Sequence, residues 1–280
     1  MKFLATLRND LEAALAGRVP SRFTHRPQKI IETVSTGIPE IDSLTGGLPR
    51  GSLTEICGPP CSGHMSMLLA ALAARTEKLE ACALVDGHDA FDPLSAEAAG
   101  VNLKHLLWVR CRNIDQSLRA TNLLLQSGGF GLIALDLSDI APQTVRYIPL
   151  NAWFRFQKTV EDTPTILLLL DQESNTKTCA SLVLSLGRNS ARWSAPPEVA
   201  QSQSQPNSLA RLLDGSGVHA KVLRSRITPV TAISSHPDFA PRAEAHSQET
   251  FRGYSETGFE VRTMWSYSGA MTSSPADSKL

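Results

Sequence analysis

Residues 53–66 read LTEICGPPCSGHMS, and this stretch decides the fold class. An apolar run ends at Cys57, glycines follow at positions 58 and 63, and a segment rich in Met, Leu and Ala begins at Met65. A strand, a glycine-rich turn and a helix in this order point backbone N–H groups and a helix N-terminus at an anion, because the glycines let the backbone wrap closely. The spacing therefore predicts a phosphate-binding loop.

Two positions of this loop depart from what hydrolysis of a nucleotide needs. A lysine normally follows the second glycine and reaches the β- and γ-phosphates, and a Ser or Thr after it holds magnesium. Here the two positions are His64, which is shorter and mostly neutral, and Met65, which is a poor ligand for a hard cation. Ser66 lies one position too late, about 100° further around the helix. The candidate cofactor-binding residues are Gly58, Pro59, Pro60, Cys61, Ser62, Gly63, His64, Met65 and Ser66.

Apolar runs alternate with helical segments on the C-terminal side of the loop. Because the runs are continuously apolar rather than alternating, they predict strands covered on both faces, and so a mostly parallel α/β sheet flanked by helices. The predicted strands are 52–57, 81–86, 106–110, 131–136, 165–171, 179–186 and 219–227, with 259–265 as a further edge strand. The predicted helices are 65–78, 114–126 and 150–160.

Composition limits the function classes. With 280 residues, the chain can form one full-size core domain with extensions. The formal net charge is zero, so a DNA contact would need a local basic patch or a partner that carries the charge. The five cysteines form no CxxC pair, which predicts reduced thiols rather than zinc ligands or disulfides.

The N-terminal segment is predicted to be a helix. Its leucine stripe suits either packing back on its own domain or docking on another subunit, and the sequence leaves both open. The stripe consists of Leu4, Leu7, Leu11 and Leu15. Charged residues interrupt the segment, which argues against a signal peptide. The longest later apolar run, at 166–170, is too short to span a bilayer, so a cytoplasmic protein is expected.

The chain is predicted to have three parts. Residues 1–33 form the N-terminal helix and a linker for interaction, and residues 34–230 form the core. Within the core, a Ser/Gln/Pro-rich stretch at about 195–210 predicts a loop or disordered excursion. Residues 231–280 form a largely flexible tail.

Three stretches of the sequence closely resemble the bacterial RecA recombinases. They are GGLPRGSLTEICGPPCSG (46–63), the preceding STGIPEIDSLTGG (35–47) and the later CALVDGHDAFDP (82–93). The resemblance covers about residues 34–229, closely as far as residue 93 and in patches beyond it. It implies a RecA-like core built around a phosphate-binding P-loop.

The same resemblance assigns roles to four further residues. Asp136 matches the residue that holds magnesium through water, and Gln172 matches a sensor of the γ-phosphate. Arg224 and Arg226 match two lysines that reach across the subunit interface toward the neighbour's nucleotide. ATP and Mg²⁺ are the implied ligands. Because the two arginines alternate along a predicted strand, a solvated strand edge is the other interpretation of the pair.

Three departures from RecA carry the functional argument. The lysine and the magnesium hydroxyl are replaced by His64 and Met65, and the glutamate that activates the attacking water is replaced by His88. The segments that match RecA's two DNA-binding loops are short, namely 137–151 and 173–178. Together they predict a protein that is not a competent ATPase and binds DNA only weakly or indirectly.

Residues 98–110 and 127–139 resemble the ImuA (SulA-like) proteins more than RecA. Members of that family have a RecA-like fold, a degenerate phosphate loop and shortened DNA loops. The resemblance implies an accessory role in the SOS response and in error-prone translesion synthesis. Its implied partners are RecA, an ImuB-like protein and an error-prone polymerase. The implied location is the cytoplasm, at the nucleoid when damage is induced.

Two alternatives stay open at this point. One is a divergent ATP-dependent recombinase that binds single-stranded DNA, with His64 or a distant lysine replacing the missing cation. The other is a purely structural partner that has lost nucleotide binding and caps or nucleates RecA filaments. The N-terminal leucine stripe and the pair Arg224 and Arg226 motivate this last possibility.

Overall fold

The computed structural model describes residues 31–193, 213–226 and 256–262. The chain divides into two compact units, Met1–Ile31 and Glu32–Leu280, and the elements below belong to the second. The predicted N-terminal helix, the predicted excursion at about 195–210 and most of the predicted tail lie outside the described residues. Within these residues, no helix is long and apolar enough to cross a membrane.

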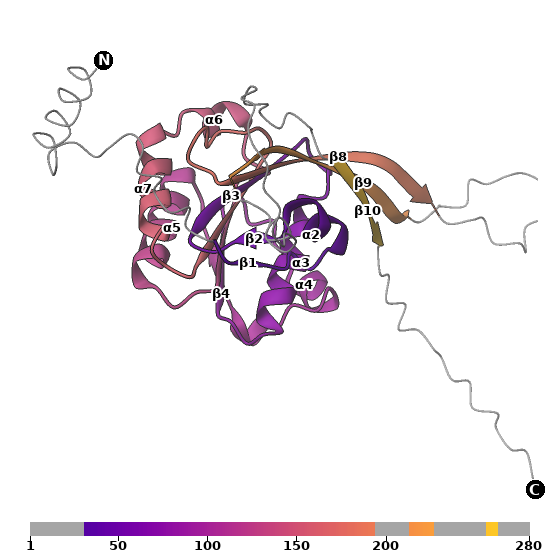
Figure 1. Cartoon of the computed structure of the whole chain (residues 1–280), viewed down its shortest axis with the longest axis horizontal. Helices are drawn as coiled ribbons and strands as arrows, with labels where there is room; N and C mark the ends of the chain where they lie inside the picture. The colour runs from indigo at the N-terminus through magenta and orange to yellow at the C-terminus, as the bar shows by residue number, and fades with distance from the viewer. Residues whose placement is uncertain (1–30, 194–212, 227–255, 263–280) are drawn as a thin grey trace, which may run out of the picture. The chain divides into compact units, whose positions relative to one another are not determined.

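An eight-stranded sheet in the order β10-β9-β8-β3-β7-β6-β4-β5 forms the centre of this unit (Figure 1). The six strands from β8 to β5 are parallel to one another, while β9 and β10 are antiparallel additions at one edge. This arrangement confirms the mostly parallel α/β sheet. The strands are β3 (Ser52–Cys57), β4 (Cys82–Asp86), β5 (Leu106–Arg110), β6 (Leu132–Asp136), β7 (Ile166–Asp171), β8 (Leu182–Trp193), β9 (Leu213–Ser225) and β10 (Glu256–Arg262).

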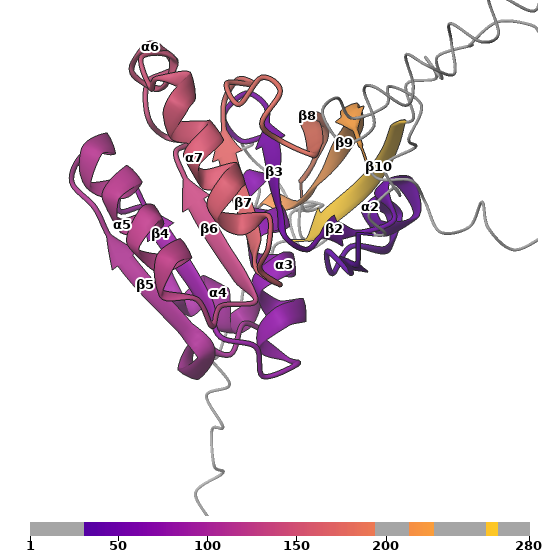
Figure 2. The same cartoon turned by 60° about the vertical axis from the view of Figure 1, so that its left-hand side comes forward.

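Helices cover both faces of the sheet (Figure 2). One face packs against α2 (Pro39–Thr45), α3 (His64–Thr76) and α4 (Pro93–Ala98), and the other against α5 (Ile114–Ser127) and α7 (Leu150–Val160). Every residue of β3, β4, β6 and β7 is therefore buried. Burial on both faces explains why these strands are continuous apolar runs in the sequence.

Several short elements escaped the sequence analysis. They are α2, α4, the small helix α6 (Pro142–Arg146), the 3-10 turn η1 (Leu103–His105), and the two-stranded sheet of β1 (Thr33–Val34) and β2 (Leu48–Pro49). Elements of two to seven residues contain too few repeats for a hydrophobic period to emerge. As a result, the segment 137–151, which matches one of RecA's DNA-binding loops, contains α6 and the first two residues of α7.

The strands at the antiparallel edge differ from their predicted bounds. β8 continues past residue 186 to Trp193, and β9 begins at Leu213 rather than at residue 219. The added part of β8 is exposed from Arg188 onward, so no hydrophobic pattern marks it in the sequence. The predicted edge strand exists as β10, three residues earlier than expected, with Phe259 buried against the core.

Candidate nucleotide site

The loop between β3 and α3 has the predicted geometry, with both glycines at positions that no other residue could occupy. A Cβ on Gly58 would lie 2.2 Å from the carbonyl oxygen of Leu186 in β8. Gly63 has a φ of +101°, and a Cβ there would lie 2.9 Å from a methyl group of Val218 in β9. The two glycines therefore let β8 and β9 pack directly against the loop.

The backbone of the loop keeps only part of its capacity to bind an anion. Pro59 and Pro60 have no N–H group, and the N–H of Ser62 donates to the carbonyl of Pro59 at 3.2 Å. Within the described part of the chain, the N–H groups of Cys61 and Gly63 have no acceptor. These two groups and the free N–H groups of the first turn of α3 remain for a phosphate.

His64 is buried beneath this loop, with only 6% of its surface exposed. Its Nδ1 lies 3.3 Å from the hydroxyl of Ser62, while Nε2 is buried with no hydrogen-bond partner among the described residues. Burial lowers the pKa of the imidazole, against the opposing effects of Asp139 and the backbone of Asp171. The ring is therefore neutral at pH 7 and supplies no positive charge to a phosphate.

Met65 and Ser66 follow on the first turn of α3. The Met65 side chain is partly buried against the core cluster that lies under α3. A thioether in this position fills space instead of offering the oxygen that magnesium needs. Ser66 is half-buried, and no hydrogen bond of its hydroxyl is found in the described residues.

Asp136 lies at the carboxyl end of β6 and is 6% exposed. Its Oδ1 accepts hydrogen bonds from the hydroxyl of Ser138 at 2.7 Å and from the Ser138 N–H at 3.0 Å. Burial raises the pKa of this carboxyl, and the nearby Asp139 and Asp86 add to the effect. One carboxylate oxygen is left for a cation. Because His64 and Met65 replace the lysine and the magnesium-binding hydroxyl, the site lacks two groups that a magnesium–triphosphate complex needs.

Gln172 joins the loops that follow β6 and β7. Its Nε2 donates to the carbonyl of Ser138 at 2.8 Å and more weakly to that of Ile140 at 3.4 Å. The Gln172 side chain was predicted to sense a γ-phosphate, but its amide group donates hydrogen bonds to backbone carbonyls of the protein.

Sequence analysis missed Glu55, a fully buried carboxylate in the middle of β3. Its Oε1 accepts from the N–H groups of Asn175 at 2.7 Å and Thr176 at 3.0 Å. Its Oε2 accepts from the hydroxyls of Ser174 and Thr176, both at 2.7 Å. Glu55 therefore holds the segment 173–178 against the core. A glutamate inside an apolar strand was the available sign in the sequence, because such a charge is rarely buried without partners.

Asp171 lies beside this cluster at the end of β7 and is also fully buried. It accepts hydrogen bonds from the Asn175 side chain and the Gln172 N–H, both at 2.7 Å. Burial and the negative charge of Glu55 nevertheless raise its pKa to about 6. Two buried carboxylates therefore hold the beginning of the short 173–178 loop.

The pKa of Asp171 predicts a pH-dependent stability. Between about pH 4 and pH 6 the folded protein keeps a proton that the unfolded chain has released, so stability falls as pH rises through this interval. In Asp171→Asn this contribution is absent. From pH 4 to pH 7 the unfolding free energy of the variant should gain about 3 kcal/mol relative to the unmodified protein. Urea unfolding at several pH values measures it.

His64 has the opposite effect and provides the control for this measurement. The unfolded chain takes up a proton below the ordinary imidazole pKa of about 6.5, and the folded protein resists it, so acidification lowers stability. His64→Gln should remove only the loss of stability on acidification that His64 causes, and should leave the contribution of Asp171 unchanged. Parallel pH profiles for Asp171→Asn and the unmodified protein would contradict the assignment to Asp171.

His88 stands at the position predicted to be degenerate, just beyond β4, and its side chain is exposed. The preceding Asp86 is 1% exposed and accepts from the N–H groups of His88, Ala90 and Phe91 and from the Trp108 indole. Asp86 therefore shapes the turn instead of binding a ligand, and no carboxylate takes the place of the missing glutamate at residue 88.

Arg224 and Arg226 are not brought to the chain's own loop. β9 runs antiparallel to β8, and Arg224 pairs with Val183 near the start of β8, whereas Gly58 packs against Leu186 further along that strand. Arg224 is half-buried, with a buried Nε that has no partner among the described residues, and Arg226 is exposed. The predicted interface residues Leu4, Leu7, Leu11 and Leu15 lie outside the described residues.

Comparison with known proteins gives one family and a set of partial relatives. The RecA N-terminal domain family matches residues 12–145. Protein RecA of Psychrobacter cryohalolentis is 39% identical over 108 residues, which is 38% of this chain and 31% of that protein. Protein RecA of Rickettsia canadensis is 36% identical over 113 residues, 40% of this chain and 33% of that protein. The chain thus matches about a third of the length of these curated relatives.

Proposed function

Because this chain is a member of the RecA-like superfamily, we propose that it acts in DNA repair as an accessory protein, through contacts with other proteins rather than through ATP hydrolysis. The observation that carries the proposal is the burial of a neutral His64 where a nucleotide site needs a cation. Phosphoryl transfer depends on positioned charge, so this replacement alone should cost orders of magnitude in rate.

The closed 173–178 loop supports the same conclusion. A loop that grips a DNA strand must offer free donors, yet the N–H groups of Asn175 and Thr176 are both committed to the buried Glu55. Opening the loop would leave a buried carboxylate without partners, which is costly. We therefore infer that the protein does not hold DNA through this loop.

The resemblance to the ImuA proteins extends the proposal to the SOS response and to error-prone translesion synthesis. The partners proposed on this basis are RecA, an ImuB-like protein and an error-prone polymerase. Arg224, near the C-terminal end of β9, and Arg226, just beyond it, are proposed to contact such a partner.

The test is binding of the full chain to RecA filaments formed on single-stranded DNA, measured together with ATP turnover. We expect binding without measurable turnover. DNA-stimulated ATP hydrolysis by the chain alone would refute the proposal and favour the alternative, a divergent recombinase. That alternative draws its support from the retained Gly58, Gly63 and Asp136.

The N-terminal leucine stripe gives a matched pair of variants for this assay. The double variant Leu7→Asp with Leu11→Asp should weaken filament binding about tenfold or more, because it places two charges in the proposed apolar contact. Asn9→Ala, on the opposite side of the predicted helix, should leave binding unchanged. Equal filament binding by the double leucine variant and by Asn9→Ala would exclude the leucine stripe as the docking element.

A further inference from the structure

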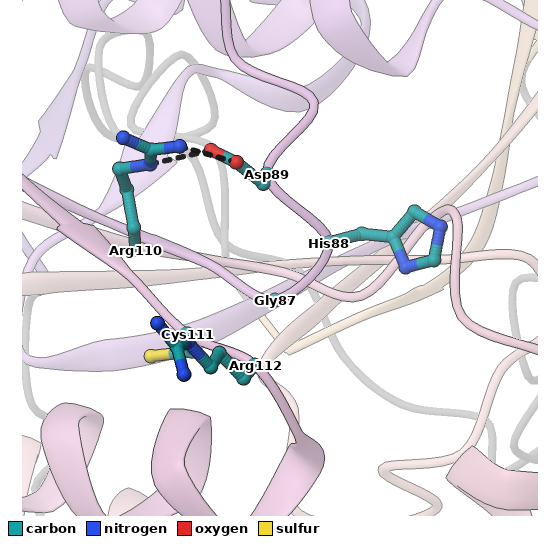
Figure 3. A pocket seen from close by; sticks show the side chains of 6 residues that line it. All are labelled: Gly87, His88, Asp89, Arg110, Cys111 and Arg112. Atoms are coloured by element: carbon teal, nitrogen blue, oxygen red, sulfur yellow. Dashed lines mark hydrogen bonds and ion pairs between the residues drawn. The ribbon is translucent and has the colours of Figure 1, made fainter.

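A second candidate site lies away from the loop, at the carboxyl ends of the two outermost parallel strands, β4 and β5 (Figure 3). It is a cavity of about 480 Å³. The residues that line it are Gly87, His88, Asp89, Arg110, Cys111 and Arg112. β7 and β6 separate β4 from the loop strand β3, which places the cavity roughly 15 Å along the sheet edge from the loop.

One wall of this cavity is a fixed ion pair. Arg110 Nε donates to Asp89 Oδ1 at 2.6 Å, and Arg110 NH2 contacts the other carboxylate oxygen. The hydrogen bond from Arg110 lowers the pKa of Asp89. The Arg110 guanidinium also lies 5.1 Å from the ring centre of Trp108, which in turn is held by Asp86. Arg110 is therefore oriented by a carboxylate and by an aromatic ring before any ligand arrives.

The second arginine of the cavity supplies an uncompensated charge. Within the described ranges, Arg112 forms no ion pair, whereas the charge of Arg110 is balanced by Asp89. The Arg112 backbone N–H donates to Gln116 Oε1 at 2.9 Å, which fixes where the side chain leaves the main chain. His88 also lines the cavity, and its side chain extends away from the Arg110–Asp89 pair (Figure 3). Arg112 therefore leaves an exposed guanidinium without a carboxylate partner among the lining residues, while Arg110 faces both Asp89 and the buried Asp86.

We propose that this cavity binds a phosphate group, with Arg112 as the principal ligand and the pre-oriented Arg110 in the same lining. Guanidinium groups bind phosphate oxygens through paired N–H donors, and phosphate carries more charge than a carboxylate. The volume admits a phosphate together with the group to which it is attached. The cavity does not include the phosphate loop, although His88 in its lining stands where the resemblance places the catalytic glutamate. The proposal does not depend on the accessory function proposed above.

The phosphate could belong to a free nucleotide-like anion or to a nucleic-acid strand, and two probes distinguish these sources. Pyrophosphate and a short oligothymidylate are titrated calorimetrically into the full chain, into Arg112→Ala and into Arg119→Ala. Arg119 is an exposed arginine on α5 that does not line the cavity, so its variant controls for general charge. Arg112 is exposed, and both variants should fold normally by circular dichroism.

We expect Arg112→Ala to weaken pyrophosphate binding about tenfold or more, while Arg119→Ala changes it less than about twofold. If oligothymidylate shows the same loss and a weaker salt dependence in Arg112→Ala, the phosphate is that of a nucleic-acid strand. If only pyrophosphate shows the loss, it is that of a small ligand. Equal binding by both variants would overturn the proposal, and so would Arg112-dependent binding of a polyglutamate peptide as tight as that of pyrophosphate.

Discussion

Replacing Glu55 with alanine is expected to lower the free energy of unfolding by about 3–5 kcal/mol. The carboxylate accepts four hydrogen bonds while fully buried, so its removal leaves two N–H groups and two hydroxyls without an acceptor. It also creates a cavity beneath residues 174–176. In a core of this size, the melting temperature should fall by roughly 10 °C.

Two variants make the Glu55 experiment decisive. Glu55→Gln keeps the shape and one acceptor oxygen, so it should lose less stability than the alanine variant. It should also bring the pKa of Asp171 below about 6, because Glu55 is one of the groups that raise it. Glu173→Ala removes an exposed glutamate of the same loop, whose carboxylate pairs with Arg146 at the surface, and should cost less than about 1 kcal/mol.

Hydrogen exchange provides the local readout for this prediction. In Glu55→Ala the amides of Asn175 and Thr176 should exchange with solvent much faster than in the unmodified protein, since both donate to Glu55. The amides of the buried strand β6 should change only as far as global stability changes. Equal effects of Glu55→Ala and Glu173→Ala on stability and exchange would show that Glu55 does not hold this loop.

The second large effect is expected at the phosphate loop. In the double variant His64→Lys with Met65→Thr, a cation and a magnesium hydroxyl return to the two positions that lack them. We expect magnesium–ATP to bind at least about tenfold more tightly than to the unmodified protein. Hydrolysis should stay absent, because the residue beyond β4 is still His88 and no carboxylate stands there.

Single variants separate the two contributions to this effect. Met65→Thr alone restores an oxygen donor without the charge, and it should change ATP affinity little. Adding His88→Glu to the double variant should then permit slow turnover if Asp136 can hold the metal. A native protein that binds and hydrolyses ATP as well as the double variant does would contradict the view that this site has lost its catalytic function.

Some features of the site could be derived from the sequence because they are local. The two glycines, the residues between them, and the replacements at His64 and Met65 all lie in one short segment, and their spacing sets the geometry of the turn. The parallel sheet was predictable for a related reason. Strands that are covered on both faces must be apolar throughout, so β4, β6 and β7 can be recognised in the sequence as uninterrupted apolar runs.

Other features depend on contacts between distant segments. Glu55 meets residues 174–176 across about 120 positions of the chain, and sequence spacing carries no information about such a contact. The cavity at β4 and β5 forms only because two parallel strands bring Asp89 and Arg110 together. The long hairpin of β8 and β9 leaves the core, where exposed residues follow no hydrophobic pattern.

The sequence by itself determined that this chain has a RecA-like core and that its phosphate loop lacks a lysine. Both features depend on residues that lie close together along the chain. Only the tertiary structure decided which interactions the polar side chains of the former nucleotide site make instead. It showed that His64 is buried and neutral, that Gln172 donates to protein carbonyls, and that Glu55 closes a loop. The physical reason is that burial sets the pKa values and hydrogen-bond partners of polar side chains, and burial is a property of the assembled fold.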